Sequence, residues 1–187
     1  MSILHTVPED EATGVVAELY AHDVESLGYV PPHTKAMALN PEAQRAFEAL
    51  VDAIRRPLGT RRYRLVTLAA AGALGSQACR LAHGRMALKH MDADEVLAVA
   101  RDFHAAGLSE AEVAMMDFAA TLSGDSASMT DADSQRLRDV GFTDEEIVSI
   151  ALAAGVRNYY SRVLHALAVD VDVPPGLTPE LQEALRA

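Results

Sequence analysis

A cysteine and a histidine four residues apart are the strongest sign of chemistry in this sequence. Cys79 and His83 lie in the segment GSQACRLAHGRMALKH, which runs from Gly75 to His90. A helix that begins at Ser76 places Cys79 in its first turn, where unpaired N–H groups and the helix dipole stabilise a thiolate. The spacing of four places His83 on the same helical face. His83 is therefore expected to act as the base or the ion-pair partner of the thiol.

Each of these residues also has a purely structural interpretation. A buried free cysteine on an alanine-rich helix is commonly a packing residue, and Ser76 is expected to act as a helix cap because no Gly-x-Ser-x-Gly motif surrounds it. Met86 and His90 continue the face of Cys79, but His83 and His90 have no evident third partner for a metal ion. We expect no metal, and Cys79, His83 and Ser76 remain the candidate catalytic residues.

The elements that must position these residues are predicted to be helices. Several helix starts combine a capping side chain with a glutamate three residues later, or with a proline directly after it. Apolar residues between these starts recur at helical spacing, and alternating strand patterns are missing. The fold class is therefore expected to be all-α. The predicted starts are Asp92 with Glu95, Ser109 with Glu112, Thr143 with Glu146, Asn40 before Pro41 and Thr178 before Pro179.

The chain is expected to form a single domain with a helical core at residues 39–170. An N-terminal helix and an extended arm, which contains Pro31 and Pro32, are expected in residues 1–38, and a tail with a short helix in residues 171–187. Helices are predicted at approximately 10–25, 41–56, 60–74, 76–90, 92–106, 109–123, 131–139, 143–168 and 178–186.

The composition is that of an acidic globular protein. Of 187 residues, 16 are Lys or Arg and 27 are Asp or Glu, which gives a net charge of −11. This charge argues against partners such as nucleic acid or an anionic membrane. A single cysteine excludes an intrachain disulfide and fits a reducing compartment. Without a signal-like N-terminus, a membrane-length apolar stretch or a nucleotide-binding glycine loop, we expect a cytoplasmic protein with no cofactor.

Four segments between about Gly28 and Leu167 resemble one protein family in the same order. The segments are GYVPPHTKAMALNPEAQRAFEAL, TRRYRLVTLAAAGALGSQACRLAHG, AGLSEAEVAMMDFAATL and VGFTDEEIVSIALAAGVRNYYSRVLHAL. They are similar to the peroxidase-related branch of the carboxymuconolactone decarboxylase and alkylhydroperoxidase D superfamily. The resemblance implies an all-helical bundle that assembles into homo-oligomers, commonly dimers, trimers or hexamers.

The resemblance also implies a site that this chain retains only in part. The family pattern has a Cys-x-x-Cys pair, a histidine four residues after the second cysteine, and a glutamate about three turns before the first. Cys79 and His83 match the second cysteine and the histidine, whereas Ser76 replaces the first cysteine and Arg64 replaces the glutamate. In the family chemistry a sulfenic acid on one cysteine is resolved by the other as a disulfide. A serine hydroxyl cannot perform that step.

Three functions remain open at this point. The first is a single-thiol peroxidase, an antioxidant oxidoreductase in which peroxide oxidises Cys79 and an external thiol reductant resolves it. The second is a redox-inactive member of the family that serves as an oligomeric protein binding a small ligand. The third is a decarboxylase or lactone-type enzyme for a small organic acid, with His83 as base and an arginine as carboxylate clamp.

Five arginines occur within ten residues of this otherwise acidic chain. They are expected to bind an anion, to form a solvated face, or to pair with acids of a neighbouring subunit. By the family register Arg64 points toward Cys79, where it stabilises a thiolate and is a candidate substrate-binding residue. Residues near the C-terminal end of the predicted 143–168 helix, including His165 and Asp170, are expected to have structural roles. The arginines are Arg55, Arg56, Arg61, Arg62 and Arg64. A second block, in the same predicted 143–168 helix, is expected to pack against the Cys79 helix or a partner subunit, and consists of Arg157, Asn158, Tyr159 and Tyr160.

Overall fold

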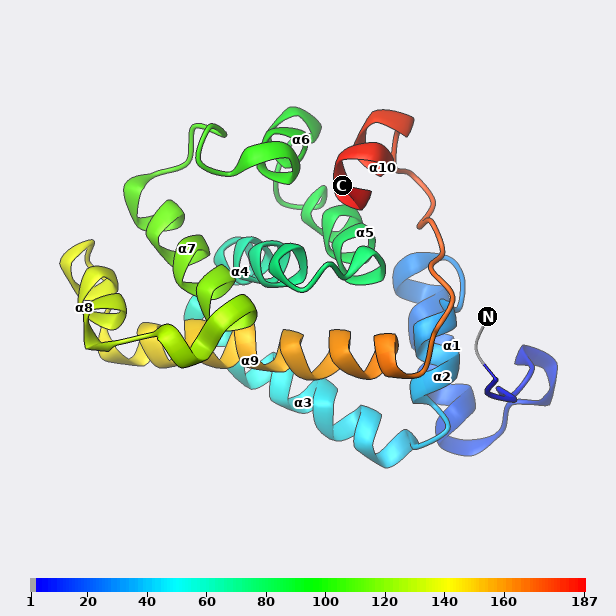
Figure 1. The fold of residues 1–187 in the computed structure, drawn as a ribbon. Coiled ribbons are helices and arrows are strands. Elements are labelled where there is room, and N and C mark those ends of the chain that lie inside the picture. Colours follow the sequence, from blue (N-terminus) through cyan, green and yellow to red (C-terminus); the bar gives the residue numbers. More distant parts are fainter. Residues whose placement is uncertain (1–2) are drawn as a thin grey trace.

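The computed structural model describes residues 3–187, which form an all-helical structure without strands (Figure 1). The all-α prediction is therefore confirmed. The elements are η1 (Glu9–Glu11), α1 (Gly14–Leu27), α2 (Pro32–Met37), α3 (Pro41–Leu58), α4 (Thr60–Ala73), α5 (Gln77–Ala87), α6 (Ala93–Asp102), α7 (Glu110–Asp125), η2 (Ser126–Ser128), α8 (Asp131–Asp139), α9 (Asp144–Ala166) and α10 (Pro179–Arg186).

Helix α4 is the centre of the bundle. It packs against α5, α7 and α9, and its residues from Leu65 to Ala71 are buried on every side. A helix that is apolar all round is stable only when neighbours cover each of its faces, which explains the low polarity of this stretch. The long helix α9 also packs against α3 and α7 (Figure 1). Helices α4, α5 and α9 therefore form a rigid frame for the segment that carries Cys79.

The helix starts lie where the capping patterns predicted them. The side chains of Asp92, Ser109 and Thr143 accept hydrogen bonds from the backbone N–H three residues later, at the starts of α6, α7 and α9. Asn40 and Thr178 cap α3 and α10 in the same way. Each cap satisfies a backbone donor that the first helical turn leaves unpaired.

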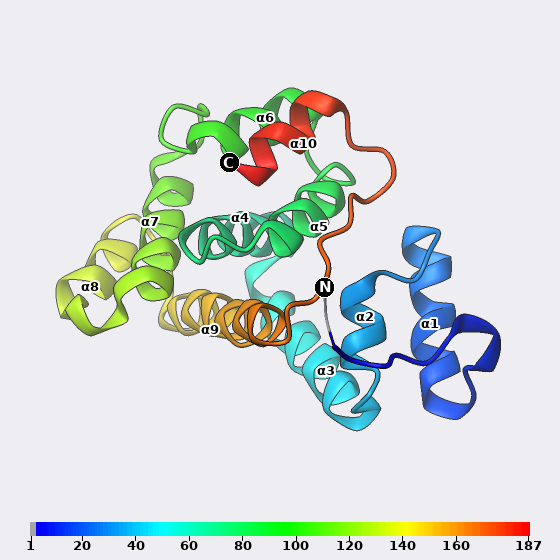
Figure 2. The same ribbon diagram turned by 45° about the vertical axis from the view of Figure 1, so that its right-hand side comes forward.

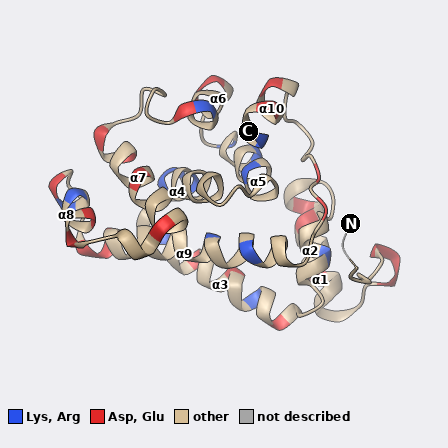
Figure 3. Ribbon diagram, in the orientation of Figure 1, with Lys and Arg blue, Asp and Glu red and all other residues tan. Residues whose placement is uncertain are grey.

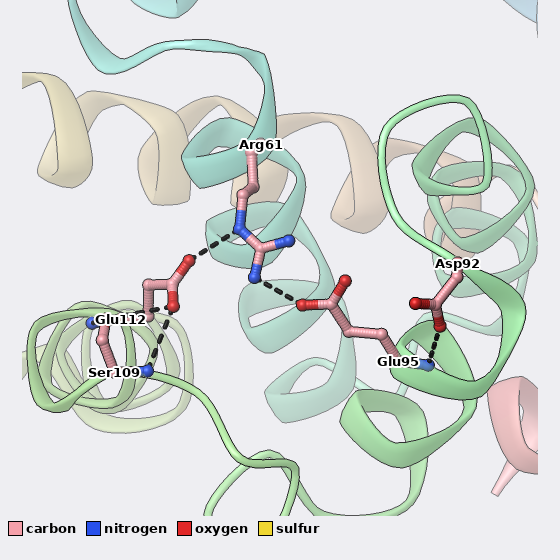
Figure 4. Close-up of polar contacts among 5 residues, drawn as sticks. All are labelled: Arg61, Asp92, Glu95, Ser109 and Glu112. Carbon is pink, nitrogen blue, oxygen red and sulfur yellow. Dashed lines mark hydrogen bonds and ion pairs between the residues drawn. The ribbon is translucent and has the colours of Figure 1, made fainter.

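Arg61 links the start of α4 to two of these caps (Figure 4). Its Nε donates to Glu112 at 2.8 Å and its Nη2 donates to Glu95 at 2.5 Å. Arg62 pairs with Glu146 at 2.6 Å, which is the capping glutamate of α9. Two consecutive arginines thus bind Glu95 and the capping glutamates Glu112 and Glu146 of the same chain. For Arg61 and Arg62, these pairs within the chain take the place of the predicted solvated face, whereas Arg56 is exposed.

Replacing Arg61 by methionine is expected to lower the free energy of unfolding by about 1 kcal/mol, because one cation serves two carboxylates in a network. High salt is expected to reduce the difference, since screening weakens exposed charge pairs. Arg101→Met is the control, because Arg101 and its partner Glu180 are both more than half exposed. Denaturant titrations of both variants test this, and equal losses for Arg61→Met and Arg101→Met would contradict it.

Residues 26–38 do not form the predicted extended arm, because α2 occupies residues 32–37 of that stretch. Pro31 is the N-cap residue and Pro32 the first helical residue, where proline has no N–H to lose and a φ already suited to a helix. The two prolines therefore start a short helix instead of preventing one. Helices α1 and α2 lie beside α3, on one side of the bundle (Figure 2).

The C-terminal segment crosses from the end of α9 to α10, which packs on α5 and α6 (Figure 2). Gly84 permits close packing between α5 and α10, since a Cβ at this position would lie 2.4 Å from Leu185 Cδ1. Arg80 donates to the carbonyls of Ala100 and Ala184, which ties α5 to both neighbours. Within residues 3–187 no helix has the length and apolar character required to cross a bilayer.

Candidate active site

A cavity of about 460 Å³ lies between the frame helices and α1 to α3. Helix α5 contributes Cys79 and His83 to its wall, α4 contributes Arg64, and α9 contributes Arg157 and Tyr160. The basic residues of α4, α5 and α9 lie around the centre of the view in Figure 3, whereas α1 carries only acidic charges. Cys79, His83 and Arg64 thus line one cavity.

Cys79 lies in the first turn of α5, as predicted, and the residue is 3% exposed. Two side chains of α9 reach it: Arg157 Nη1 donates to Sγ at 3.3 Å, and Ser161 Oγ donates to Sγ at 3.2 Å. Two donors aimed at one sulfur stabilise the thiolate more than the thiol, because the thiolate is the stronger acceptor. The two donors around Sγ therefore favour the ionised form of Cys79.

Arg157 is the main source of that effect. Its side chain is buried, and no carboxylate in residues 3–187 forms an ion pair with it. Burial lowers the pKa of Arg157, but the Cys79 thiolate and Tyr63 raise it, and the net direction is upward. A buried cation is costly unless an anion lies next to it. In its ionised form, Cys79 would supply that anion to Arg157.

The pKa of Cys79 changes in the complementary direction. Burial raises it, while the Arg157 charge, hydrogen bonds from Ser161 and Arg157, and the nearby Ser76 hydroxyl lower it, and the net result lies below the ordinary value. A lowered pKa increases the fraction of Cys79 that is ionised at neutral pH.

The surroundings of His83 do not favour the ion-pair role that its spacing predicted. Its Nδ1 lies 3.0 Å from Arg64 Nη1, so it accepts from the guanidinium and the proton stays on Nε2. Burial, followed by the charges of Arg157 and Arg64, lowers the pKa of His83 well below its ordinary value. A neutral imidazole is not an ion-pair partner for a thiolate, and one with so low a pKa is a weak base. Arg157 takes the ion-pair role instead.

Ser76 and His90 also differ from their expected places. Ser76 is the N-cap residue of α5, but its side chain makes no capping hydrogen bond. The Ser76 hydroxyl is fully buried and helps to lower the pKa of Cys79 from behind the cavity wall. Helix α5 ends at Ala87, so the exposed His90 does not continue the face of Cys79 and His83. His165 is exposed near the end of α9 and does not line the cavity.

Arg64 lines the cavity, as the family register predicted. Burial lowers its pKa to about 10, so the guanidinium remains charged at neutral pH. Its contact with His83 is a contact with a neutral ring, and no carboxylate in the described part of the chain pairs with it. Arg55, by contrast, pairs with Asp52 at 2.7 Å.

The sequence interpretation missed Arg157 and Ser161 as site residues. The block around Arg157 was expected only to pack against the Cys79 helix, and Tyr160 does so in a cluster with Cys79. A signal was present, because Arg157 continues the buried stripe of Ile150 and Ala153 at helical spacing. A charged residue within an apolar stripe needs a buried partner, and that requirement predicts a site.

His33 of α2 is a further cavity residue that the sequence interpretation missed. Burial lowers its pKa to about 4, with Asp172 opposing and Arg157 adding to the shift. A histidine with a depressed pKa stabilises the fold above pH 6.5, and this stability is lost as the pH falls toward 4.

His33→Phe is therefore expected to remove part of the acid sensitivity, by roughly 2 kcal/mol between pH 6.5 and 4. Urea unfolding of the wild type and the variant at both pH values measures this difference. A variant that loses as much stability on acidification as the wild type would show that His33 is not the group that titrates.

Comparison with known proteins gives matches among solved structures, whereas no protein-family model and no curated protein matches the sequence. A peroxidase-related protein of Ralstonia eutropha JMP134, described as an alkylhydroperoxidase AhpD core, has a TM-score of 0.81 at 23% identity, covering 100% of this chain and 97% of that one. A peroxidase-related protein of Silicibacter sp. TM1040 has a TM-score of 0.79 at 26% identity, covering 91% and 92%.

The debrominase Bmp8, in complex with 2,3,4-tribromopyrrole, has a TM-score of 0.78 at 18% identity, covering 99% of this chain and 98% of that one. The similarity to all three extends over nearly the whole of both chains. The helices that carry Cys79, His83, Arg64 and Arg157 are thus part of the shared architecture. The chain has the fold of the AhpD-like, peroxidase-related proteins, in agreement with the superfamily that its sequence resembles.

Proposed function

We propose that the protein is a single-thiol reductase in which the Cys79 thiolate reduces a hydroperoxide and an external thiol restores it. The observation that carries this proposal is the contact between Cys79 Sγ and the buried Arg157 guanidinium, 3.3 Å apart on the wall of a cavity. A buried arginine without a carboxylate is not needed for packing, but it is needed to hold a thiolate. A cysteine with a purely structural role does not require a buried arginine beside its sulfur.

The proposed reaction balances with one thiolate and two external thiols. The Cys79 thiolate attacks the terminal oxygen of the hydroperoxide, the O–O bond breaks, and the leaving alkoxide takes a proton from water in the cavity. Cys79 becomes a sulfenic acid. One external thiol displaces water from this sulfenic acid to form a mixed disulfide, and a second releases Cys79 as the thiolate. An external thiol is required because residue 76 is serine.

Two features of the relatives support this choice. The first two structures are described as peroxidase-related, which fits an antioxidant role for this chain. The debrominase complex with tribromopyrrole shows that the same fold accommodates a small organic ring in that protein. A cavity of about 460 Å³ in this chain is within the range that holds small organic ligands. The decarboxylase hypothesis is less favoured, because it needs His83 as a base and the pKa of His83 is low.

Mass spectrometry after brief exposure to hydroperoxide tests this proposal. With a sulfenate-trapping reagent present, the wild type is expected to carry the label on Cys79 and to consume peroxide repeatedly when a small thiol is supplied. Cys79→Ser is expected to do neither. An unlabelled Cys79, with peroxide consumption equal to that of Cys79→Ser, would overturn the proposal and favour a ligand-binding protein without redox activity.

A further inference from the structure

We infer that the cavity selects an organic substrate with an anionic group, a carboxylate or a similar oxyanion, which Arg64 binds beside Cys79. This inference rests on the proposed function, because it names the class of substrate that the Cys79 thiolate attacks. The body of the substrate is expected to be small and apolar, since Phe47, Met86 and Leu164 form part of the cavity wall.

Two cations and one thiolate meet on the cavity wall around Cys79. Arg64 and Arg157 bring two positive charges, and the Cys79 thiolate brings one negative charge. The groups that act on Arg64 include the cations Arg55 and Arg157 but no carboxylate, and no carboxylate acts on His83. Arg64, Arg157 and the thiolate by themselves therefore leave one net positive charge, which an anionic ligand would neutralise.

The carboxylates elsewhere on the cavity wall form no ion pair with Arg64. Asp23 accepts from the Thr34 hydroxyl, Glu48 accepts from Gln44 Nε2 at 2.9 Å, and Asp52 pairs with Arg55. Arg56 also has no carboxylate partner, but it is exposed and does not line the cavity, so Arg64 is the member of the arginine cluster that faces the cavity without an ion pair.

The second argument is the unused hydrogen-bonding capacity of the two arginines. The Nε atoms of Arg64 and Arg157 are buried and have no hydrogen-bond partner among the described residues. Buried donors of this kind are uncommon in a folded protein, and at a site they indicate a missing acceptor. A guanidinium binds a carboxylate through two parallel N–H donors, of which Nε is one.

The third argument is the position of Arg64 relative to the sulfur. Arg64 contacts His83, which lies one helical turn after Cys79 on α5, and all three side chains line the same cavity. When Arg64 holds the anionic group, the rest of a short substrate therefore lies in the same cavity as Cys79. Arg157 is already occupied by the thiolate, so Arg64 is the residue that binds the substrate's charge.

Alkylation of Cys79 by a matched pair of reagents tests the inference without any assumption about the natural substrate. Iodoacetate carries a carboxylate, whereas iodoacetamide is neutral and of nearly the same size. The ratio of their rate constants, divided by the same ratio for free 2-mercaptoethanol, is independent of how much thiolate is present. For the wild type, the rate constant for iodoacetate divided by that for iodoacetamide, normalised in this way, is expected to be about ten or more. A hydrogen bond between charged groups contributes a factor of that size.

Two variants make the test specific. Arg64→Gln is expected to return the normalised ratio to within about twofold of one, while iodoacetamide still reacts with Cys79. Arg55→Gln removes an equal charge from the same cavity wall, but Arg55 is neutralised by Asp52, so the ratio is expected to stay within about twofold of the wild type. Circular dichroism confirms that each variant is folded.

The outcomes separate this inference from the proposed function. If iodoacetamide reacts with Cys79 faster than with a free thiol at pH 7 but iodoacetate shows no preference, the inference is wrong and the reactive thiolate stands. If the preference exists and survives in Arg64→Gln, the assignment of Arg64 is wrong. If Cys79 reacts with neither reagent faster than a free thiol does, the proposed function is overturned as well.

Discussion

Replacing Arg157 by glutamine is expected to slow the alkylation of Cys79 at pH 7 by about tenfold or more. Glutamine keeps an N–H donor but removes the charge, and the charge opposes the effect of burial on the thiol. Without it, burial raises the pKa of Cys79 and the thiolate becomes a minor species at neutral pH. The rate of reaction with iodoacetamide, measured as a function of pH, reports the change directly.

The control is Arg162→Gln on the same helix. Arg162 is exposed and contacts Asn158, so its loss is expected to leave the pH profile of Cys79 unchanged. The rate at high pH, where the thiol of every variant is ionised, separates a shifted pKa from blocked access to the cavity. A profile for Arg157→Gln with the wild-type midpoint would contradict the pairing of Arg157 with the thiolate.

Replacing Cys79 by alanine is expected to lower the free energy of unfolding by about 3 kcal/mol, more than a cavity the size of a sulfur atom would explain. The reason is that Arg157 then remains buried without an anion. In an Arg157→Met background the same Cys79→Ala substitution is expected to cost only about 1 kcal/mol. The coupling between the two positions, about 2 kcal/mol, is measured by denaturant unfolding of the four proteins.

The pH dependence of this cost has a defined sign. Folding lowers the pKa of Cys79, so the stabilisation from the ion pair increases as the pH rises from the folded-state pKa to about 8.5, the value in the unfolded chain. The stability gap between the wild type and Cys79→Ala is therefore expected to be larger at pH 8.5 than at pH 6. Additive costs at the two positions, or a gap that narrows with rising pH, would be inconsistent with a buried ion pair.

The sequence predicted those parts of the fold that local interactions determine. A capping residue and its glutamate lie within four positions, so Ser109 with Glu112 and Thr143 with Glu146 could be recognised without knowing the fold. The short helix α2 was not recognised, because a helix of six residues has too little apolar periodicity and its two prolines also fit an extended segment. Its stability comes from packing against α1 and α3.

The site was predictable only where one helix or the family resemblance carried the information. Cys79 was correctly expected in the first turn of its helix because that depends on nearby residues. Its contact with Arg157 joins residues 78 positions apart and depends on how α9 crosses α5. The same is true of the bond between Arg64 and His83, in which the imidazole accepts from the guanidinium. Spacing within one helix cannot show what a second helix contributes.

The ultraviolet absorbance of the thiolate, followed during a pH titration, tests the central claim most directly. The chain has one cysteine, so the difference between the wild type and Cys79→Ala reports that residue alone. The account predicts a midpoint clearly below about 8.5, with the thiolate already formed in a substantial fraction at pH 7. A midpoint at or above 8.5 would mean that burial outweighs Arg157, and that Cys79 is a packing residue.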